Sequence, residues 1–310
     1  MAEPYPMKGD DDDNSYFKNS SFQKAIDNAK SLIDETIAPS FNLKDLLFGS
    51  SSSFNIADLG CLVGPNTFIC AENIIGAVKY NCQSQGLASQ IPEFQVFFND
   101  HVFKDFNTLF KSLPPERGYF AAGLPGSFHV RLFPRSSLHF IHTSSALHWI
   151  SQVPGEILDR NSPAWNKGRI FYTNAPYEEY KPYATRLLFN FYLNHAQRLV
   201  SEVQLDSFNL PMYIPYPEEI LEVVERNKCF SVEKIELFKP VYDIVDVRTS
   251  MQAWAMHLRA GLTGMLKKYF GNETIDELFD QFFKKSQEFS CRVQAGSAEF
   301  HHVFLALKRI

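Results

Sequence analysis

Apolar and polar positions along the chain follow the short periods that are typical of an α/β protein. The first clear example is residues 54–59, where apolar side chains at Phe54 and Ile56 precede an apolar run. Gly60 and Gly64 follow at once, with a proline after the second glycine. This order predicts a short buried strand, a glycine turn and a new helix.

Similar patterns predict the other elements of the chain. From Ser20 to Ile37, apolar residues recur at helical spacing and predict a first helix over the glycine turn. We expect further strands at 94–98, 138–141, 230–238 and 302–307, and further helices at 183–200, 217–224 and 251–270. The last strand is expected to pair antiparallel with 230–238.

Acidic residues stand at the ends of the first two predicted strands. In α/β sheets, ligands lie outside the carboxyl ends of the strands, where glycines let the backbone come close. The GxxxG spacing of the turn differs from the GxGxxG of dinucleotide folds, which disfavours a pyrophosphate cofactor. Asp58 beside the turn instead suits a cationic adenosyl ligand, S-adenosylmethionine. Asp100 ends the next strand, where ribose hydroxyls are usually held.

Composition narrows the function classes. The 310 residues are 45% hydrophobic and 21% charged, which is ordinary for a globular chain, and the net charge of -5 disfavours nucleic acid as a partner. Five cysteines without CxxC pairing indicate neither a disulfide framework nor a zinc site, so we expect a reducing, cytoplasmic setting. No apolar stretch has the length of a membrane span, and no membrane partner is expected.

Several motifs in order resemble the SABATH family of plant S-adenosylmethionine-dependent carboxyl methyltransferases. The turn DLGCLVGPNT is similar to that family's DLGCSSGPNT signature. The match continues through NSYFKNSSFQ, FFNDHVFKDFNTLF, GLPGSFHVRLFPRSSLHFIHTSSALHWISQVP, NKGRIFYTNAP and DSFNLPMY, and so covers nearly the whole chain. The resemblance implies an α/β fold with a Rossmann-like class I methyltransferase sheet and a helical cap, and a homodimer.

The resemblance also implies one methyltransferase domain over residues 1–310. Within it we expect an N-terminal lid at 1–40, a cofactor-binding core at 50–175, a partial helical cap with the returning strand at 176–290, and the last strand at 291–310.

The cofactor site is predicted by the same motifs. The residues that match the family's cofactor contacts are Tyr16, Ser20, Asp58, Cys61, Asn66, Asp100, His101, Ser127, Phe128, Thr143, Ser144 and Ser145. Ser127 would lie at the edge of the adenine and Phe128 on its face. Ser145 stands where the family often has an aromatic residue, which alters one wall of the site. Without the resemblance, Ser20 reads as a helix cap and Asp100 as a turn former.

The predicted acceptor site has uncharged donors. Gln23 and Trp149 match a family pair that binds a substrate carboxylate through an amide and an indole N–H, and His148 would shape the acceptor pocket. A carboxylate is already ionised at neutral pH, so no general base and no catalytic residue is required, and orientation supplies the rate. Without the resemblance, Gln23 reads as a surface residue and Trp149 as a core residue.

A magnesium site is implied at some distance from this chemistry. Its oxygen donors would be the side chains of Asn166, Asp206 and Asn209 with the backbone carbonyl of Phe208. We expect such an ion to be structural. An Asx-type turn is the alternative for this segment.

One segment departs from the family. Between NKGRIFYTNAP and DSFNLPMY, family members usually have about sixty more residues, and residues 175–210 contain no β-branched run that could form a buried parallel strand. We therefore expect the fifth strand and part of the cap over the acceptor to be missing.

Transfer of a methyl group from S-adenosylmethionine to the carboxylate of a small plant metabolite, giving a methyl ester, is the leading prediction. The missing segment keeps open a catalytically impaired relative that acts as a dimer partner. An N-methyltransferase of a purine alkaloid is the third possibility, and the glycine spacing disfavours a nicotinamide oxidoreductase.

Overall fold

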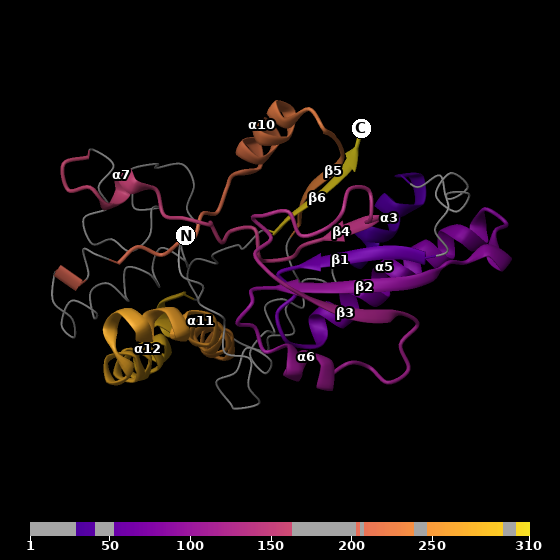
Figure 1. The fold of residues 1–310 in the computed structure, drawn as a ribbon. Coiled ribbons are helices and arrows are strands. Elements are labelled where there is room, and N and C mark those ends of the chain that lie inside the picture. Colours follow the sequence, from indigo (N-terminus) through magenta and orange to yellow (C-terminus); the bar gives the residue numbers. More distant parts are fainter. Residues whose placement is uncertain (1–28, 41–52, 163–202, 205–207, 239–246, 294–301) are drawn as a thin grey trace.

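A parallel four-stranded sheet organises the first half of the chain (Figure 1). The computed structural model describes residues 29–40, 53–162, 203–204, 208–238, 247–293 and 302–310. The strand order is β3-β2-β1-β4, with bounds β1 Ser53–Leu59, β2 Glu93–Asp100, β3 Phe120–Pro125 and β4 Phe140–His142. The sheet confirms the predicted α/β architecture.

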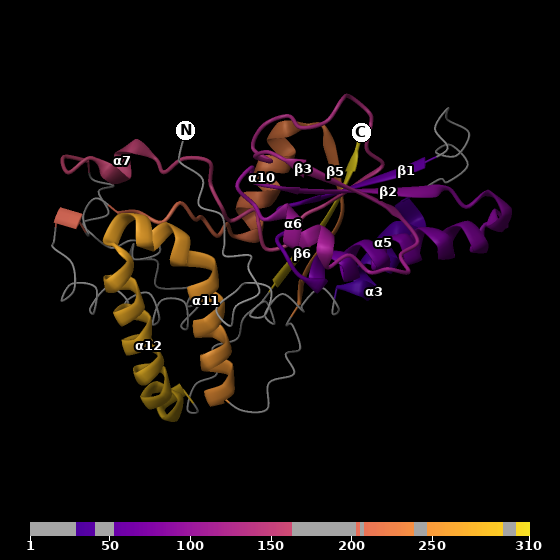
Figure 2. The same cartoon turned by 60° about the horizontal axis from the view of Figure 1, so that its bottom comes forward.

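Two helices cover one face of this sheet. α3 (Lys30–Ser40) packs against α5 (Pro65–Ser84), α5 packs against β1, and buried side chains of both helices join those of β1 and β2 in one cluster (Figure 2). Alternate side chains of the two strands are buried beneath them, among them Phe54, Ile56 and Phe98. The sheet and these helices share one hydrophobic core, and the carboxyl edge of the strands remains available for a site.

The turn between β1 and α5 has the predicted conformation. Gly64 precedes the helix with a φ of 146°, and a proline occupies the first helical turn. Proline suits that position because its missing N–H would have no helical partner there. A short 3₁₀ helix η2 (Ala88–Gln90) then leads into β2, and α6 (Phe106–Lys111) follows β2. Asp105 caps α6 by accepting the N–H of Thr108 at 3.0 Å.

A second hydrophobic cluster lies away from the sheet. α11 (Val247–Phe270) and α12 (Asn272–Val293) run side by side (Figures 1 and 2). Gly271, with a φ of 86°, allows the tight turn between them. Their buried side chains pack with Phe208 and with Trp149, which links the cluster to the segment after β4. The sequence pattern predicted α11, whereas α12 was not expected.

β5 (Phe230–Phe238) and β6 (His302–Arg309) form a separate antiparallel pair, as predicted. α10 (Pro217–Asn227) precedes β5, and the short α7 (Gly155–Leu158) follows β4. Among the described residues, no strand joins this pair to β4. Phe230 and Val232 are 40% and 38% exposed rather than inward as expected. Lys234 on β5 contacts Glu35 of α3 through an ion pair.

The cysteines and the helices bear on the expected absence of disulfides and of membrane spans. Cys61, Cys70, Cys82 and Cys229 are free. No helix in the described ranges combines the length and the apolarity that crossing a bilayer requires.

Candidate functional site

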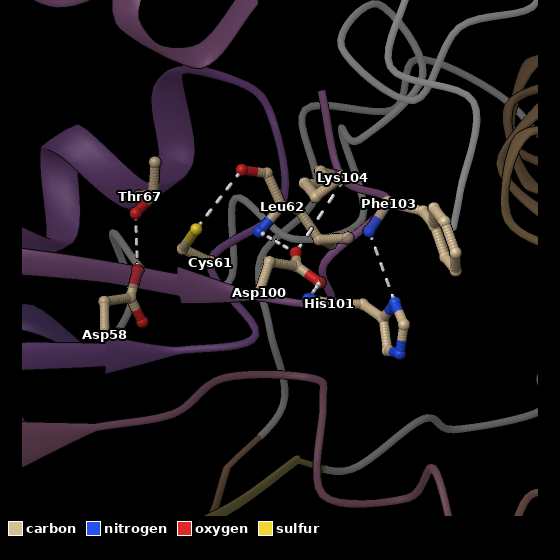
Figure 3. A network of polar contacts seen from close by, with 8 residues as sticks. All are labelled: Asp58, Cys61, Leu62, Thr67, Asp100, His101, Phe103 and Lys104. Carbon is tan, nitrogen blue, oxygen red and sulfur yellow. Dashed lines mark hydrogen bonds and ion pairs between the residues drawn. The ribbon is translucent and has the colours of Figure 1, made fainter. Parts of the chain in front are cut away.

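The carboxyl ends of β1 and β2 bring Asp58 and Asp100 to the same edge of the sheet (Figure 3). Cys61 lies in the turn between them. Burial raises the pKa of its thiol well above the ordinary value, and the negative charges of Asp100 and Asp58 raise it further. The sulfur therefore stays protonated and is no nucleophile. Both carboxylates therefore act on the same thiol from the ends of neighbouring strands.

The glycine turn is fixed onto the end of β2. The backbone N–H groups of Gly60 and Cys61 donate to the carbonyl of Asn99 at 2.9 and 3.0 Å. The next N–H, of Leu62, donates to Asp100 Oδ2 at 2.9 Å. The side-chain amide of Asn99 donates to the carbonyls of Leu124 and of the glycine after β3, so this one buried residue links the ends of β1, β2 and β3 through its backbone carbonyl and its side chain.

Gly60 permits a close approach that no other residue type would allow. Its φ is 73°, and a Cβ built there would lie 2.5 Å from the Cβ of Ala146 and 3.6 Å from the ring of Phe128. The loop after β4 and the loop after β3 thus both reach the turn. A cradle of this kind, with backbone at the surface and an aromatic ring beside it, fits a flat nucleoside.

Asp58 is held by two side chains that the motif analysis did not select. Thr67, in the first turns of α5, donates its hydroxyl to one carboxylate oxygen, and His142 Nδ1 lies 2.9 Å from the other. Burial lowers the pKa of His142, but the neighbouring Cys70 and the Asp58 carboxylate together raise it well above its ordinary value. His142 is therefore protonated and offsets the charge of Asp58. The sheet register, which places His142 opposite Asp58, is the signal that could have identified it.

Stability should depend on pH through this ion pair. Because the folded-state pKa of His142 is raised, its stabilisation is complete below the unfolded histidine pKa of about 6.5 and is lost as the pH rises through the folded-state value. We expect the wild-type protein to lose about 2 kcal/mol of unfolding free energy from this source on the alkaline side, relative to His142→Asn. Urea unfolding of both proteins over a pH series measures it. Parallel pH curves for the two proteins would contradict the assignment.

The loop after β4 carries two buried donors that have no acceptor among the described residues. These are the hydroxyl of Thr143 and the indole N–H of Trp149. Ser145, between them, adopts a left-handed φ of 51°, and Trp149 donates its backbone N–H to the carbonyl of Ala146 at 3.0 Å. Unpaired buried donors are costly in a native protein and often mark a ligand position. This loop is also the one that reaches Gly60.

Residues 211–213, which follow the segment that departs from the family, hold the loop after β4 in place. Tyr213 donates its N–H to the carbonyl of His148 at 2.7 Å, and Ile150 donates to that of Pro211 at 3.0 Å. Met212 forms an isolated antiparallel bridge with Trp149. Burial, and secondarily His257 on α11, lower the pKa of His148 to about 4. At neutral pH His148 is therefore an uncharged wall beside Trp149.

The structure gathers most of the predicted cofactor residues at this edge. Asn66 is buried in the first turn of α5, Ser127 accepts the N–H of His129 at 3.3 Å, and Ser144 lies in the loop after β4. His101 donates its backbone N–H to Asp100 Oδ1 at 2.7 Å. The arrangement fits an adenosyl cofactor, while the binding role of each residue stays a prediction.

Some predicted residues cannot be placed. Tyr16, Ser20, Gln23, Asn166 and Asp206 lie outside the described residues, as does the helix predicted at 183–200. The ring of Phe208 is 1% exposed in the second hydrophobic cluster, and Asn209 follows it. The magnesium site therefore stays a prediction.

Comparisons with known proteins agree with this geometry. The sequence profile of the family described as SAM dependent carboxyl methyltransferase matches residues 2–191 and 188–310. Loganic acid O-methyltransferase of Catharanthus roseus is 37% identical over 336 residues, covering 93% of this chain and 89% of the relative. A solved structure of loganic acid methyltransferase with SAH has a TM-score of 0.88 at 36% identity and covers 98% of both chains. The 3,7-dimethylxanthine N-methyltransferase CkTbS of Camellia sinensis var. assamica is 32% identical and covers 89% of both chains.

The same comparisons locate the missing segment. The family profile breaks at residues 188–191, inside the region 175–210 where the sequence departs from the family. Aligning with the Catharanthus enzyme takes 336 positions, but 93% of this chain is only about 288 residues, so about 48 positions of that enzyme have no counterpart. The shortfall and the break in the profile support a deletion in this region, while the loss of a fifth strand and of part of the cap stays a prediction.

Profile, relatives and fold therefore agree with the motif resemblance. The chain belongs to the SABATH family of S-adenosylmethionine-dependent carboxyl methyltransferases.

Proposed function

We propose that this protein transfers a methyl group from S-adenosylmethionine to the carboxylate of a small plant metabolite and releases the methyl ester. The observation that carries the proposal is the indole N–H of Trp149, which is buried without an acceptor among the described residues. It lies on the loop that touches the glycine turn between Asp58 and Asp100. A donor in that place suits an anionic acceptor beside the cofactor.

Each part of the site has a separate task in this proposal. The bound cofactor supplies an electrophilic methyl group on a sulfonium. Asp100 accepts the ribose hydroxyls, Asp58 faces the methionine end, and Phe128 stacks on the adenine. Trp149, with Gln23, holds one carboxylate oxygen in line with the methyl carbon. Orientation of this kind can supply roughly 7 to 11 kcal/mol of the barrier.

This chemistry requires no general base. A carboxylic acid with a pKa of about 4 is already ionised at neutral pH. His148 is uncharged there because burial and His257 lower its pKa to about 4, so it does not repel or protonate a neighbouring group. The buried, protonated Cys61 cannot compete as a methyl acceptor. The site therefore needs only to bind, orient and exclude water.

Radiolabelled S-adenosylmethionine with a pool of plant carboxylic acids tests the proposal. We expect label in base-labile esters of one or a few acids. If label appears instead on xanthines and on no acid, the protein is an N-methyltransferase, a possibility that its similarity to the Camellia enzyme supports. If the protein binds S-adenosylhomocysteine but labels neither class, it is a catalytically impaired relative, which the missing 48 or so positions favour.

Three finer properties complete the proposal. We propose a structural magnesium ion bound by Asn166, Asp206, Asn209 and the carbonyl of Phe208, since oxygen donors suit this hard cation. A fall in melting temperature with chelator, reversed by Mg²⁺, tests it. We further propose that the protein is a homodimer, which sedimentation measures. We also propose that it resides in the cytoplasm, which a fluorescent fusion tests.

A further inference from the structure

Lys104 is a buried cation at the end of β2 that no motif singled out (Figure 3). Its side chain is 1% exposed, and its Nζ lies 3.9 Å from Asp100 Oδ2, which is too long for a hydrogen bond. Within the described residues the ammonium has no hydrogen-bond acceptor. Burying an ammonium with so little compensation costs several kcal/mol. Such a position is expected where the charge acts on a functional group.

The backbone around Lys104 holds it in place. Its N–H donates to the carbonyl of His101 at 2.8 Å, and its carbonyl accepts the N–H of Phe106 at 2.9 Å. This tight turn leads from β2 into α6 and fixes the origin of the side chain. The ammonium then points back toward the Asp100 carboxylate instead of toward solvent (Figure 3).

Asp100 already has two donors from the protein. Leu62 donates to its Oδ2 at 2.9 Å and His101 to its Oδ1 at 2.7 Å, both through backbone N–H groups. Lys104 is the only lysine or arginine of the described residues that forms an ion pair with it. A carboxylate oxygen can accept more than one hydrogen bond, so capacity remains for ligand hydroxyls.

The charges near Lys104 come from both sides of the turn. Burial lowers the pKa of the Lys104 ammonium, while the carboxylates of Asp100 and Asp105 raise it. Asp58 on β1 acts on the neighbouring thiol of Cys61. The remaining titratable group around Asp100 is His101. Burial lowers its pKa below the ordinary value, and Asp100 offsets part of that shift.

We propose that Lys104 is a positioning residue for the ribose of the cofactor: its buried ammonium stabilises the ionised Asp100 carboxylate and orients it toward the sugar hydroxyls. Lys104 acts through Asp100 and does not touch the transferred methyl group. The inference rests on the proposed function, in which Asp100 binds the ribose.

Calorimetric titration with S-adenosylhomocysteine tests this role without depending on activity. We expect Lys104→Met to bind about tenfold more weakly than wild type and Lys104→Arg within about threefold, since arginine keeps the charge. The matched control is Lys111→Met, which removes an exposed lysine of α6 and should bind as tightly as wild type. Circular dichroism and thermal unfolding confirm that each variant is folded. Lys104→Gln replaces the methionine variant if that one fails to fold.

A double-mutant cycle distinguishes action through Asp100 from a general packing role. Asp100→Asn with Lys104→Met should bind no more weakly than Asp100→Asn alone, because the lysine then has no carboxylate to position. Additive losses would overturn the proposal, as would unchanged affinity in Lys104→Met.

The alkaline pH profile gives a second readout. Wild-type affinity should fall as the pH rises through the lowered pKa of Lys104, whereas Lys104→Arg should hold its affinity, because guanidinium does not deprotonate in this range. Ionisation of the ligand affects the affinity of every variant equally and so does not change the comparison between them. Identical profiles would contradict the role of Lys104 but leave the proposed cofactor site standing. No saturable binding by the wild-type protein would remove both this inference and the proposed cofactor site.

Discussion

Replacing Trp149 by phenylalanine should lower kcat/KM for ester formation about a hundredfold and leave the melting temperature nearly unchanged. Losing one preorganised donor to a reacting oxygen typically costs a factor of roughly 10² to 10³. The indole N–H is buried and has no acceptor among the described residues. Removing it therefore breaks no hydrogen bond seen in the ligand-free protein, and stability should change little. The phenyl ring retains much of the packing against the second hydrophobic cluster. Steady-state kinetics and thermal unfolding of the same preparation measure both effects.

Tyr119→Phe is the matched control for this variant. The hydroxyl of Tyr119 is likewise buried without a partner among the described residues, but it belongs to the core beneath the sheet. Burial, aided by Glu72, raises the pKa of this phenol to about 12, so it carries no charge at working pH. The control should retain both activity and stability. Full activity in Trp149→Phe would refute the acceptor assignment.

Gly60→Ala should cost about 3 kcal/mol of unfolding free energy, whereas Gly86→Ala should cost about 1 kcal/mol. The two glycines have nearly the same left-handed φ, 73° and 74°, so alanine is similarly strained at both. They differ in their surroundings. A Cβ on Gly60 meets the Cβ of Ala146 at 2.5 Å, and one on Gly86 meets nothing within 4 Å. The difference between the two variants isolates the contact between the turn and the loop after β4.

Urea unfolding measures both variants. Ala146→Gly in the Gly60→Ala background should recover the part of the loss that comes from the contact and leave the backbone strain. Equal losses for the two glycines would mean that the loop does not press on the turn. The account of how Trp149 is placed beside the cofactor would then fail.

Strong periodicity made part of the fold predictable. The alternating apolar residues of β1 and β2 and the glycine turn after β1 gave their elements directly, and the pairing of β5 with β6 was anticipated. β3 was not predicted, because its sequence FAAGLP contains glycine, proline and small residues and resembles a bend. α12 was also missed, although its acidic and apolar residues alternate at helical spacing.

Without the motif resemblance, the candidate site was predictable where side chains stand at strand ends. Asp58 and Asp100 could be placed from their position in the sequence, since parallel strands end at a common edge. His142 and Lys104 could not. The first is 84 residues from its partner and requires the strand order, and the second is a lysine that sequence alone would place in solvent. Burial and register decide both, and neither is visible in a local motif.

A crystal structure with bound S-adenosylhomocysteine is the most direct measurement of the central claim. The account predicts the ribose hydroxyls within about 3 Å of the Asp100 carboxylate, the amino acid end of the ligand beside Asp58, and the sulfur facing the loop that carries Trp149. A ligand found elsewhere on the chain, or one at this edge whose ribose does not contact Asp100, would contradict it.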